Sequence, residues 1–261
     1  MELKNVYKVN KITEGTQKIQ GMDQSERFLF GVDSKVRSDD LLQNNIGLFE
    51  WVTRNKIHPI FWGRNIVGEN SLDKDEIEFL HGKGCKIVAI CSTSDSKKSE
   101  VQGKIFAKKV ILTALELGLP PETAIYLEIA ENENINQSYL YGFAKAMLTE
   151  GYIPGFKANT DALFAFDREF SRGVKTDGDV FGKCLIWAVA PTLAEYDGIT
   201  TTHRIHPDTW KPFSPSGISR RDIAIWQYGK DCHPIYDDYN NEVVFNINII
   251  KNCKIIFDNM F

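Results

Sequence analysis

The sequence lacks several features that would assign a function class directly. No apolar run approaches the roughly 18 residues that a membrane span needs, and the 31 basic residues form no block. No glycine-rich phosphate turn follows the first apolar run, and no Gly-x-Ser-x-Gly motif occurs. We therefore expect no membrane span, no nucleic-acid partner, no dinucleotide site and no serine nucleophile of that type.

Paired cysteines and an apolar leader are also missing. The five cysteines are Cys85, Cys91, Cys184, Cys232 and Cys253, an odd number without paired spacing. The first three lie in or beside apolar runs, where free thiols pack as small hydrophobic groups. No apolar run follows the charged residues at the N-terminus. We expect a reduced protein that is cytoplasmic as synthesised, with export by a non-classical route left open.

What is present is enough apolar sequence for a large core. The chain has 261 residues, of which 43% are hydrophobic and 25% charged, with a net charge of −4. Such a composition is typical of a folded globular protein. The length suits one α/β barrel of roughly 250 residues. We assign residues 28–261 to a single barrel domain and residues 1–27 to an N-terminal arm.

Apolar runs alternate with helical patterns along most of the chain. Strands are expected at 28–33, 58–62, 86–91, 124–130, 152–157, 184–189, 222–228 and 242–248. Helices are expected at 39–56, 72–81, 98–117, 136–150 and 161–170, and loops at 171–182 and 191–219. This order predicts an α/β fold, a (β/α)8 TIM-type barrel that is irregular in its second half. An open doubly wound sheet is less favoured, because the phosphate turn is absent.

Two carboxylates interrupt or end apolar strands. Glu128 lies within the run Ala124–Ala130, and Asp33 ends the run 28–33. A buried carboxylate is costly unless it is paired or used in chemistry. Carboxylates at strand ends above a barrel are typical of glycoside hydrolysis. We expect a raised pKa for Glu128, as a general acid needs, with Asp33 as its partner. The alternative is that Glu128 forms a structural ion pair with Arg64.

Aromatic residues also lie on or at the ends of the expected strands. Trp62, Trp187, Trp226 and Tyr228 suit either stacking on sugar rings or packing in the core. The only metal-like spacing is His203-x-x-His206 with Asp208, which lacks a further ligand nearby. We therefore expect neither a metal nor a cofactor.

Six short motifs, in this order, resemble one bacterial family. They are Phe30-Gly-Val-Asp33, Phe61-Trp-Gly-Arg64, Ala124-Ile-Tyr-Leu-Glu128, Gly151-Tyr-Ile-Pro-Gly-Phe156, Ile225-Trp-Gln-Tyr228 and Val244-Phe-Asn-Ile-Asn248. Over about residues 28–250 the chain resembles the glycoside-hydrolase-like domain-of-unknown-function family, which is related to the glycoside hydrolase family 25 lysozymes. The resemblance implies a (β/α)8-type barrel with a polysaccharide site, for peptidoglycan or muropeptides, at the carboxyl ends of the strands. Any non-classical export would then lead to the cell wall.

The match is incomplete at the positions that carry catalysis in the lysozymes. Asp33 matches the acid at the end of the first strand, and 226–228 match the motif of the seventh. Where the lysozymes have Asp-x-Glu, this chain has Glu128-Ile-Ala130, so Ala130 stands in place of the key Glu. Glu131, the residue after Ala130, and Glu133 offer replacements for the missing Glu. On the eighth strand Asn246-Ile-Asn248 replaces the usual Asp-x-Asn.

Two hypotheses follow from this pattern. The first is a peptidoglycan hydrolase, and the second is a catalytically inactive barrel that binds glycan or serves as a targeting or scaffold module. The catalytic candidates are Asp33, Glu128 and Glu131. The candidates for substrate binding are Arg64, Trp62, Trp187, Trp226, Gln227, Tyr228 and Asn246. Because each lies at the end of an expected strand, we predict that Asp33, Arg64, Glu128, Trp187, Gln227 and Asn246 converge at one barrel mouth.

Overall fold

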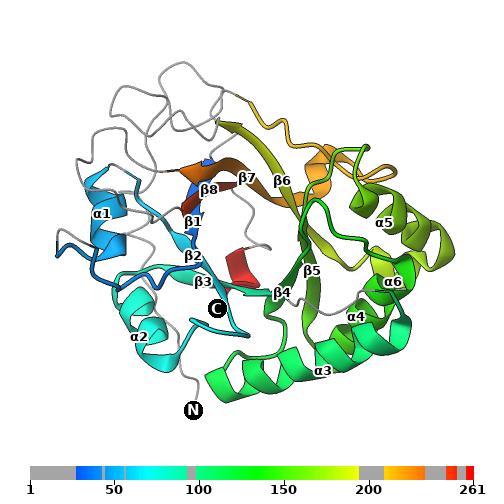
Figure 1. Ribbon diagram of the computed structural model, residues 1–261, viewed down its shortest axis with the longest axis horizontal. Coiled ribbons are helices and arrows are strands. Elements are labelled where there is room, and N and C mark those ends of the chain that lie inside the picture. Colours follow the sequence, from blue (N-terminus) through cyan, green and yellow to red (C-terminus); the bar gives the residue numbers. More distant parts are fainter. Residues whose placement is uncertain are drawn as a thin grey trace, which may run out of the picture.

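Eight strands close into one barrel in the order in which they occur in the sequence (Figure 1). The computed structural model describes residues 28–42, 45–55, 57–92, 98–193, 209–232, 245–251 and 257–261. The strands are β1 (Phe28–Asp33), β2 (Phe61–Asn65), β3 (Lys86–Cys91), β4 (Ala124–Glu128), β5 (Ile153–Ala158), β6 (Leu185–Leu193), β7 (Ile223–Cys232) and β8 (Phe245–Lys251). The expected N-terminal arm lies outside the described residues.

The last strand runs opposite to the others. Neighbouring strands from β1 to β7 are parallel, whereas β8 is antiparallel to both β7 and β1. The prediction of an α/β barrel is confirmed, and part of the irregularity expected in its second half is this reversal. As a consequence, the beginning of β8, not its end, lies beside the carboxyl end of β1, with Asn246 paired with Asp33.

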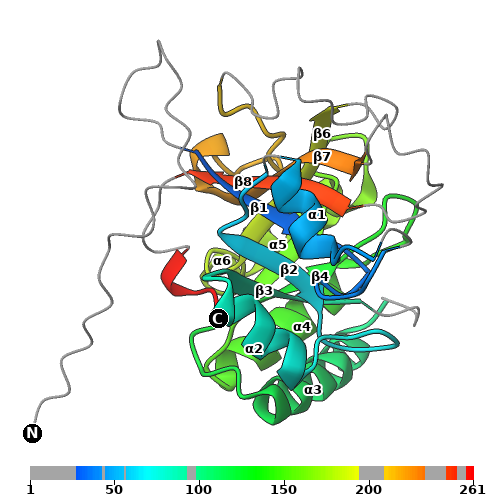
Figure 2. The ribbon, with the colours of Figure 1, turned by 90° about the vertical axis from the view of Figure 1, so that its left-hand side faces the viewer.

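Helices follow most strands and surround the barrel (Figures 1 and 2). They are α1 (Leu48–Arg54), α2 (Lys74–Gly82), α3 (Glu100–Leu117), α4 (Gln137–Thr149), α5 (Ala165–Thr176) and α6 (Gly178–Phe181), with a 3-10 turn η2 at Arg220–Asp222. The ends of α3 have clear local causes. Ser99 and Gln102 form a capping box at its start, and Gly118 adopts a left-handed φ of 81° at its end.

Two segments differ in kind from the expected pattern, and others are shifted, such as the strand expected at 58–62, which is β2 at Phe61–Asn65. The helix expected from residue 39 begins only at Leu48, because Leu41 and Gly47 pair with each other in an antiparallel bridge. Residues 171–182, expected as a loop, contain the end of α5 and all of α6. The two helices pack closely at Gly173, since a Cβ at this glycine would lie 2.2 Å from the Phe181 ring.

Side chains alternate between the barrel interior and the surrounding helices. The interior contains a small apolar cluster with Phe61, Tyr126, Trp187 and Ile225, while the larger core lies between the strands and the helices. Gly63 keeps the interior open near the carboxyl ends of the strands. A Cβ there would lie 2.7 Å from the Cβ of Asp33 and 2.9 Å from the Trp187 ring. The polar interior at this end therefore depends on a glycine.

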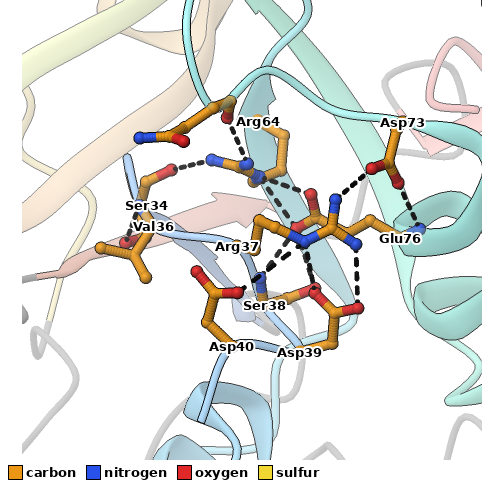
Figure 3. Close-up of polar contacts among 10 residues, drawn as sticks. Ser34, Val36, Arg37, Ser38, Asp39, Asp40, Arg64, Asp73 and Glu76 are labelled. Carbon is orange, nitrogen blue, oxygen red and sulfur yellow. Dashed lines mark hydrogen bonds and ion pairs between the residues drawn. The ribbon is translucent and has the colours of Figure 1, made fainter. Parts of the chain in front are cut away.

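A buried ion pair joins β2 to α2, and its two side chains also bind the segment after β1 (Figure 3). Arg64 Nε lies 2.9 Å from Glu76 Oε1, and both side chains are fully buried. Glu76 also accepts hydrogen bonds from the backbone and hydroxyl of Ser38. Arg64 further donates to the carbonyl oxygens of Ser34 and Asn70. These contacts fix the chain immediately after Asp33, outside the barrel wall.

In the described part of the chain, we find no helix with both the length and the apolar character of a membrane span.

Candidate functional site

Three charged side chains meet inside the barrel at the carboxyl ends of the parallel strands. The ammonium of Lys157, on β5, lies 2.7 Å from Asp33 Oδ2 and 2.9 Å from Glu128 Oε1. Those two carboxylate oxygens are therefore at most 5.6 Å apart, the sum of the two contacts. Lys157 and Asp33 are buried, whereas one third of the Glu128 side chain is exposed. We name Asp33, Glu128 and Lys157 the Lys157 cluster.

The reversed strand β8 completes the surroundings of Asp33. Asn248 Nδ2 donates to Asp33 Oδ1 at 2.6 Å, and Asn246 Nδ2 donates to Oδ2 at 2.9 Å. Asn248 in turn accepts a 2.9 Å hydrogen bond from Trp187 Nε1. Both oxygens of Asp33 are thus held by donors, and the carboxylate is fixed by β1, β5 and β8 together.

The charges of the Lys157 cluster stabilise one another. Burial lowers the pKa of Lys157, but the attraction of Asp33 and Glu128 outweighs it and raises the pKa well above its ordinary range. The same attraction of Lys157 lowers the pKa of Glu128 against the effect of burial, and Lys35 adds to the lowering. The Lys157 ammonium also lies 4.8 Å from the centre of the Trp187 ring, a cation–π contact.

The raised pKa that we expected for Glu128 is therefore wrong. The expectation considered the apolar neighbours of Glu128 in sequence and the desolvation that they impose. It missed the lysine on the neighbouring strand, since Glu128 and Lys157 are partners in the β4–β5 register. The expected pair of Glu128 with Arg64 is wrong for the same reason, because Lys157 takes that place.

Part of the predicted convergence is present. Asp33, Glu128, Trp187 and Asn246 lie at one barrel mouth, with Lys157 and Asn248 added. Gln227 pairs with Asn248 in the β7–β8 register and is buried on the same side. Its Oε1 has no hydrogen-bond partner among the described residues.

The other four candidates for substrate binding, which are Trp62, Arg64, Trp226 and Tyr228, face away from the interior. Arg64 is bound to Glu76 of α2, and Trp62 packs against Phe49 of α1 with ring centres 5.6 Å apart. Trp226 donates from Nε1 to Ala190 O at 2.7 Å, and its ring contacts those of Trp210 and Tyr228. The reason is the two-residue period of a strand. With Gly63 and Gln227 facing inward, the residues on either side of each must face the helices.

Glu131 lies on the rim rather than in the Lys157 cluster. It is exposed and accepts a 3.1 Å hydrogen bond from Asn159, while Glu133 accepts one from the Ala130 backbone. These side chains line a hollow of about 10 Å³, together with Ile129, Ala158, Phe164 and Phe166. That volume suits about one water molecule. The rim therefore offers polar groups beside Ala130.

Lys157 is the site residue that sequence reasoning missed. It ends the apolar run of the fifth strand just as Glu128 interrupts the fourth, and a buried lysine needs acidic partners as much as a buried acid needs basic ones. A search for charged residues of both signs within strands would have found it. The His203 and His206 pair lies outside the described residues. Among those that are described, no group of three or more His, Cys, Asp or Glu is placed to hold a metal ion.

Solved structures share this barrel. An uncharacterized protein from B. stearothermophilus is 22% identical, with a TM-score of 0.69, and the match covers 89% of this chain and 100% of that one. A muramidase from Acremonium alcalophilum is 12% identical, with a TM-score of 0.49 and coverages of 87% and 95%. The catalytic domain of endolysin ply40 from bacteriophage P40 of Listeria monocytogenes is 15% identical, with a TM-score of 0.48 and coverages of 89% and 97%.

These likenesses concern the fold. The first of them shows that the barrel is shared with another protein, in agreement with the fold that the family resemblance implies. The more distant two add no argument about what the Lys157 cluster does. No protein-family model matches the chain, and no curated protein does.

Proposed function

We propose that this chain is a glycan-binding barrel of the glycoside-hydrolase type whose two central carboxylates do not act as acid and base. The observation that carries the proposal is the Lys157 ammonium, bound to both Asp33 and Glu128. Two-carboxylate hydrolysis needs one protonated carboxyl near neutral pH and one ionised carboxylate. The ammonium lowers the pKa of Glu128, so Glu128 does not carry the proton that a general acid must supply.

The ligand class rests on the resemblance and on the polar rim. The family motifs point to peptidoglycan or a related polysaccharide, bound at the carboxyl ends of the strands. Glu128 is one third exposed there, and Glu131 and Asn159 add acceptors and donors that suit sugar hydroxyl and amide groups. Binding through such groups needs no general acid.

A hydrolase is the second candidate, and one distance favours it. Asp33 Oδ2 and Glu128 Oε1 are at most 5.6 Å apart, an upper limit close to the carboxyl separation of about 5–5.5 Å that is typical of retaining glycosidases. This candidate requires that substrate binding breaks the contact between Lys157 and Glu128, so that one carboxyl regains a proton.

The test measures binding and turnover on the same samples. Insoluble peptidoglycan and soluble chitooligosaccharides are incubated with the wild type, and bound protein and new reducing ends are both quantified. We expect saturable binding without new reducing ends. The double variant Glu131→Ala/Asn159→Ala should weaken binding at least fivefold. Glu150→Ala removes an exposed acid at the opposite end of the barrel and should change nothing.

Two outcomes would overturn the proposal. Release of reducing ends by the wild type, abolished by Glu128→Gln, would establish the hydrolase instead. Absence of both binding and release would remove both glycan functions and leave a scaffold whose partner is a protein.

A further inference from the structure

The longest helix exposes large aliphatic side chains to solvent. On α3, the exposed fractions are 66% for Val101, 63% for Ile105, 62% for Leu112 and 57% for Leu115. The helix lies at the outer edge of the molecule (Figures 1 and 2). Its opposite face is already packed, with Phe106, Val110 and Ile111 in the main core. Single exposed aliphatic residues are normal, but four on one helix are typical of an interaction surface.

The helix cannot turn to hide these side chains. A Cβ at Gly103 of α3 would lie 2.2 Å from the carbonyl oxygen of Tyr139, and one at Gly142 of α4 would lie 2.1 Å from that of Glu100. The two backbones are therefore in close contact at two glycines, which fixes how α3 is rotated. Its apolar outer face is imposed by this packing.

The exposed side chains follow the spacing of a coiled-coil seam. Together with Lys108 they stand at positions 101, 105, 108, 112 and 115, with steps that alternate between four and three residues. Alternating steps of this kind place side chains in one narrow stripe that packs against another helix. We name Val101, Ile105, Lys108, Leu112 and Leu115 the α3 seam.

Lysines give the seam its charge. Lys108 occupies its central position, Lys104 and Lys109 lie on either side of it, and Glu116 lies one heptad after Lys109 on the same flank. In coiled coils, flanking charges select the partner, and a charged residue within the seam restricts the partner further. The whole chain carries a net charge of −4, so this face is basic on an acidic protein.

We propose that the α3 seam docks an amphipathic helix of a different protein, which places acidic side chains opposite Lys108 and along the edges. A second copy of this chain fits poorly. Lys108 is the middle residue of the seam, so both a parallel pair in register and an antiparallel pair about a two-fold axis place the two Lys108 ammonium groups face to face. A lipid surface requires no alternating spacing, and interfacial helices generally present a broader apolar face with aromatic residues.

The first test uses designed peptides and the full chain. An acidic peptide of about three heptads carries leucine at its seam positions and glutamate at its flanks and opposite Lys108. A basic peptide has lysine in place of every glutamate. Fluorescence anisotropy should show the acidic peptide binding at least tenfold more tightly than the basic one. Lys108→Glu should reduce that preference at least fivefold, because the attraction at the centre of the seam becomes repulsion.

Matched variants distinguish binding at the α3 seam from non-specific hydrophobic binding. Ile105→Asp and Leu112→Asp should each weaken binding of the acidic peptide at least tenfold, since each places a carboxylate in the apolar stripe. Leu41→Asp makes the same change at a leucine that is 70% exposed on another segment, and it should leave binding unchanged. Circular dichroism checks that all four proteins are folded.

Three results would overturn the proposal. Equal affinity for the two peptides would show that the lysines select nothing. Sedimentation velocity that reveals a dimer, lost in Ile105→Asp, would establish a second copy as the occupant. Cosedimentation with phosphatidylserine vesicles that Ile105→Asp abolishes, without binding of the acidic peptide, would establish a lipid surface.

Discussion

At the scale of single residues, Lys157 decides the chemistry of the barrel mouth. It binds Asp33 and Glu128 at once. The local sequence suggested an acid with a raised pKa, whereas in the structure Lys157 lowers the pKa of that acid. One side chain from a neighbouring strand thus reverses an inference that rested on burial alone.

The pH dependence of stability should reflect the contact between Lys157 and Glu128. Because Lys157 lowers the pKa of Glu128 in the folded state, Glu128 contributes stability above its unfolded value of about 4.5, and that contribution is lost as pH falls through the lower folded value. We expect the melting temperature of the wild type to fall below about pH 4.5 more steeply than that of Glu128→Gln. Parallel acid profiles of the two proteins would contradict the assigned contact.

Replacing Lys157 should reverse the direction in which the free energy of unfolding changes with pH near neutrality. In Lys157→Met, Asp33 and Glu128 remain close together as like charges, so the pKa of one rises. A group with a raised folded pKa contributes stability below its unfolded pKa, and this is lost as pH rises through the folded value. The free energy of unfolding of Lys157→Met should therefore increase from pH 7 to pH 5 and lie about 3–5 kcal/mol below the wild type at pH 7. Denaturant unfolding at both pH values measures it.

At the scale of elements, the link between β2 and α2 holds the chain that follows Asp33. Removing one partner of the fully buried Arg64–Glu76 pair should cost about 3–5 kcal/mol, because the remaining charge stays buried without a counter-charge. Urea unfolding of Arg64→Met should show this loss, and the double variant Arg64→Met/Glu76→Leu should recover part of it. A single variant within about 1 kcal/mol of the wild type would mean that water or another group replaces the partner.

The strands and most helices follow from local sequence, whereas the polar contacts do not. Apolar runs give β3, which follows Gly84, and β4, which follows Pro120 and Pro121, and Ser99 and Gly118 mark both ends of α3. Which face of a strand points inward depends on the whole barrel. Trp62 and Arg64 point outward because Gly63, between them, faces the interior. Contacts between residues far apart in sequence, such as Asp33 and Lys157, form because the barrel closes, and no local sequence pattern predicts them.

At the scale of the whole molecule, Asn248 connects strands that close the barrel. It donates to Asp33 on β1 and accepts from Trp187 on β6. Asn248→Ala leaves both of these buried groups without that partner, and each such group costs about 1–3 kcal/mol. We expect a loss of at least about 2 kcal/mol in the free energy of unfolding, measured by urea. Asn246→Ala, at a half-buried position, serves as the comparison and should lose less.

The reversed β8 also has a consequence for the order in which the protein can be made. Every residue of β1 pairs with β8, from Phe28 with Lys251 to Asp33 with Asn246. The ribosome delivers β1 more than two hundred residues before that partner. Until then, one edge of β1 and one edge of β7 have no strand beside them, and such edges pair with other chains. The barrel therefore completes its closure late in synthesis, through contacts of long sequence separation that form slowly. Newly made chains should be most prone to aggregate in the interval between the synthesis of β7 and that of β8.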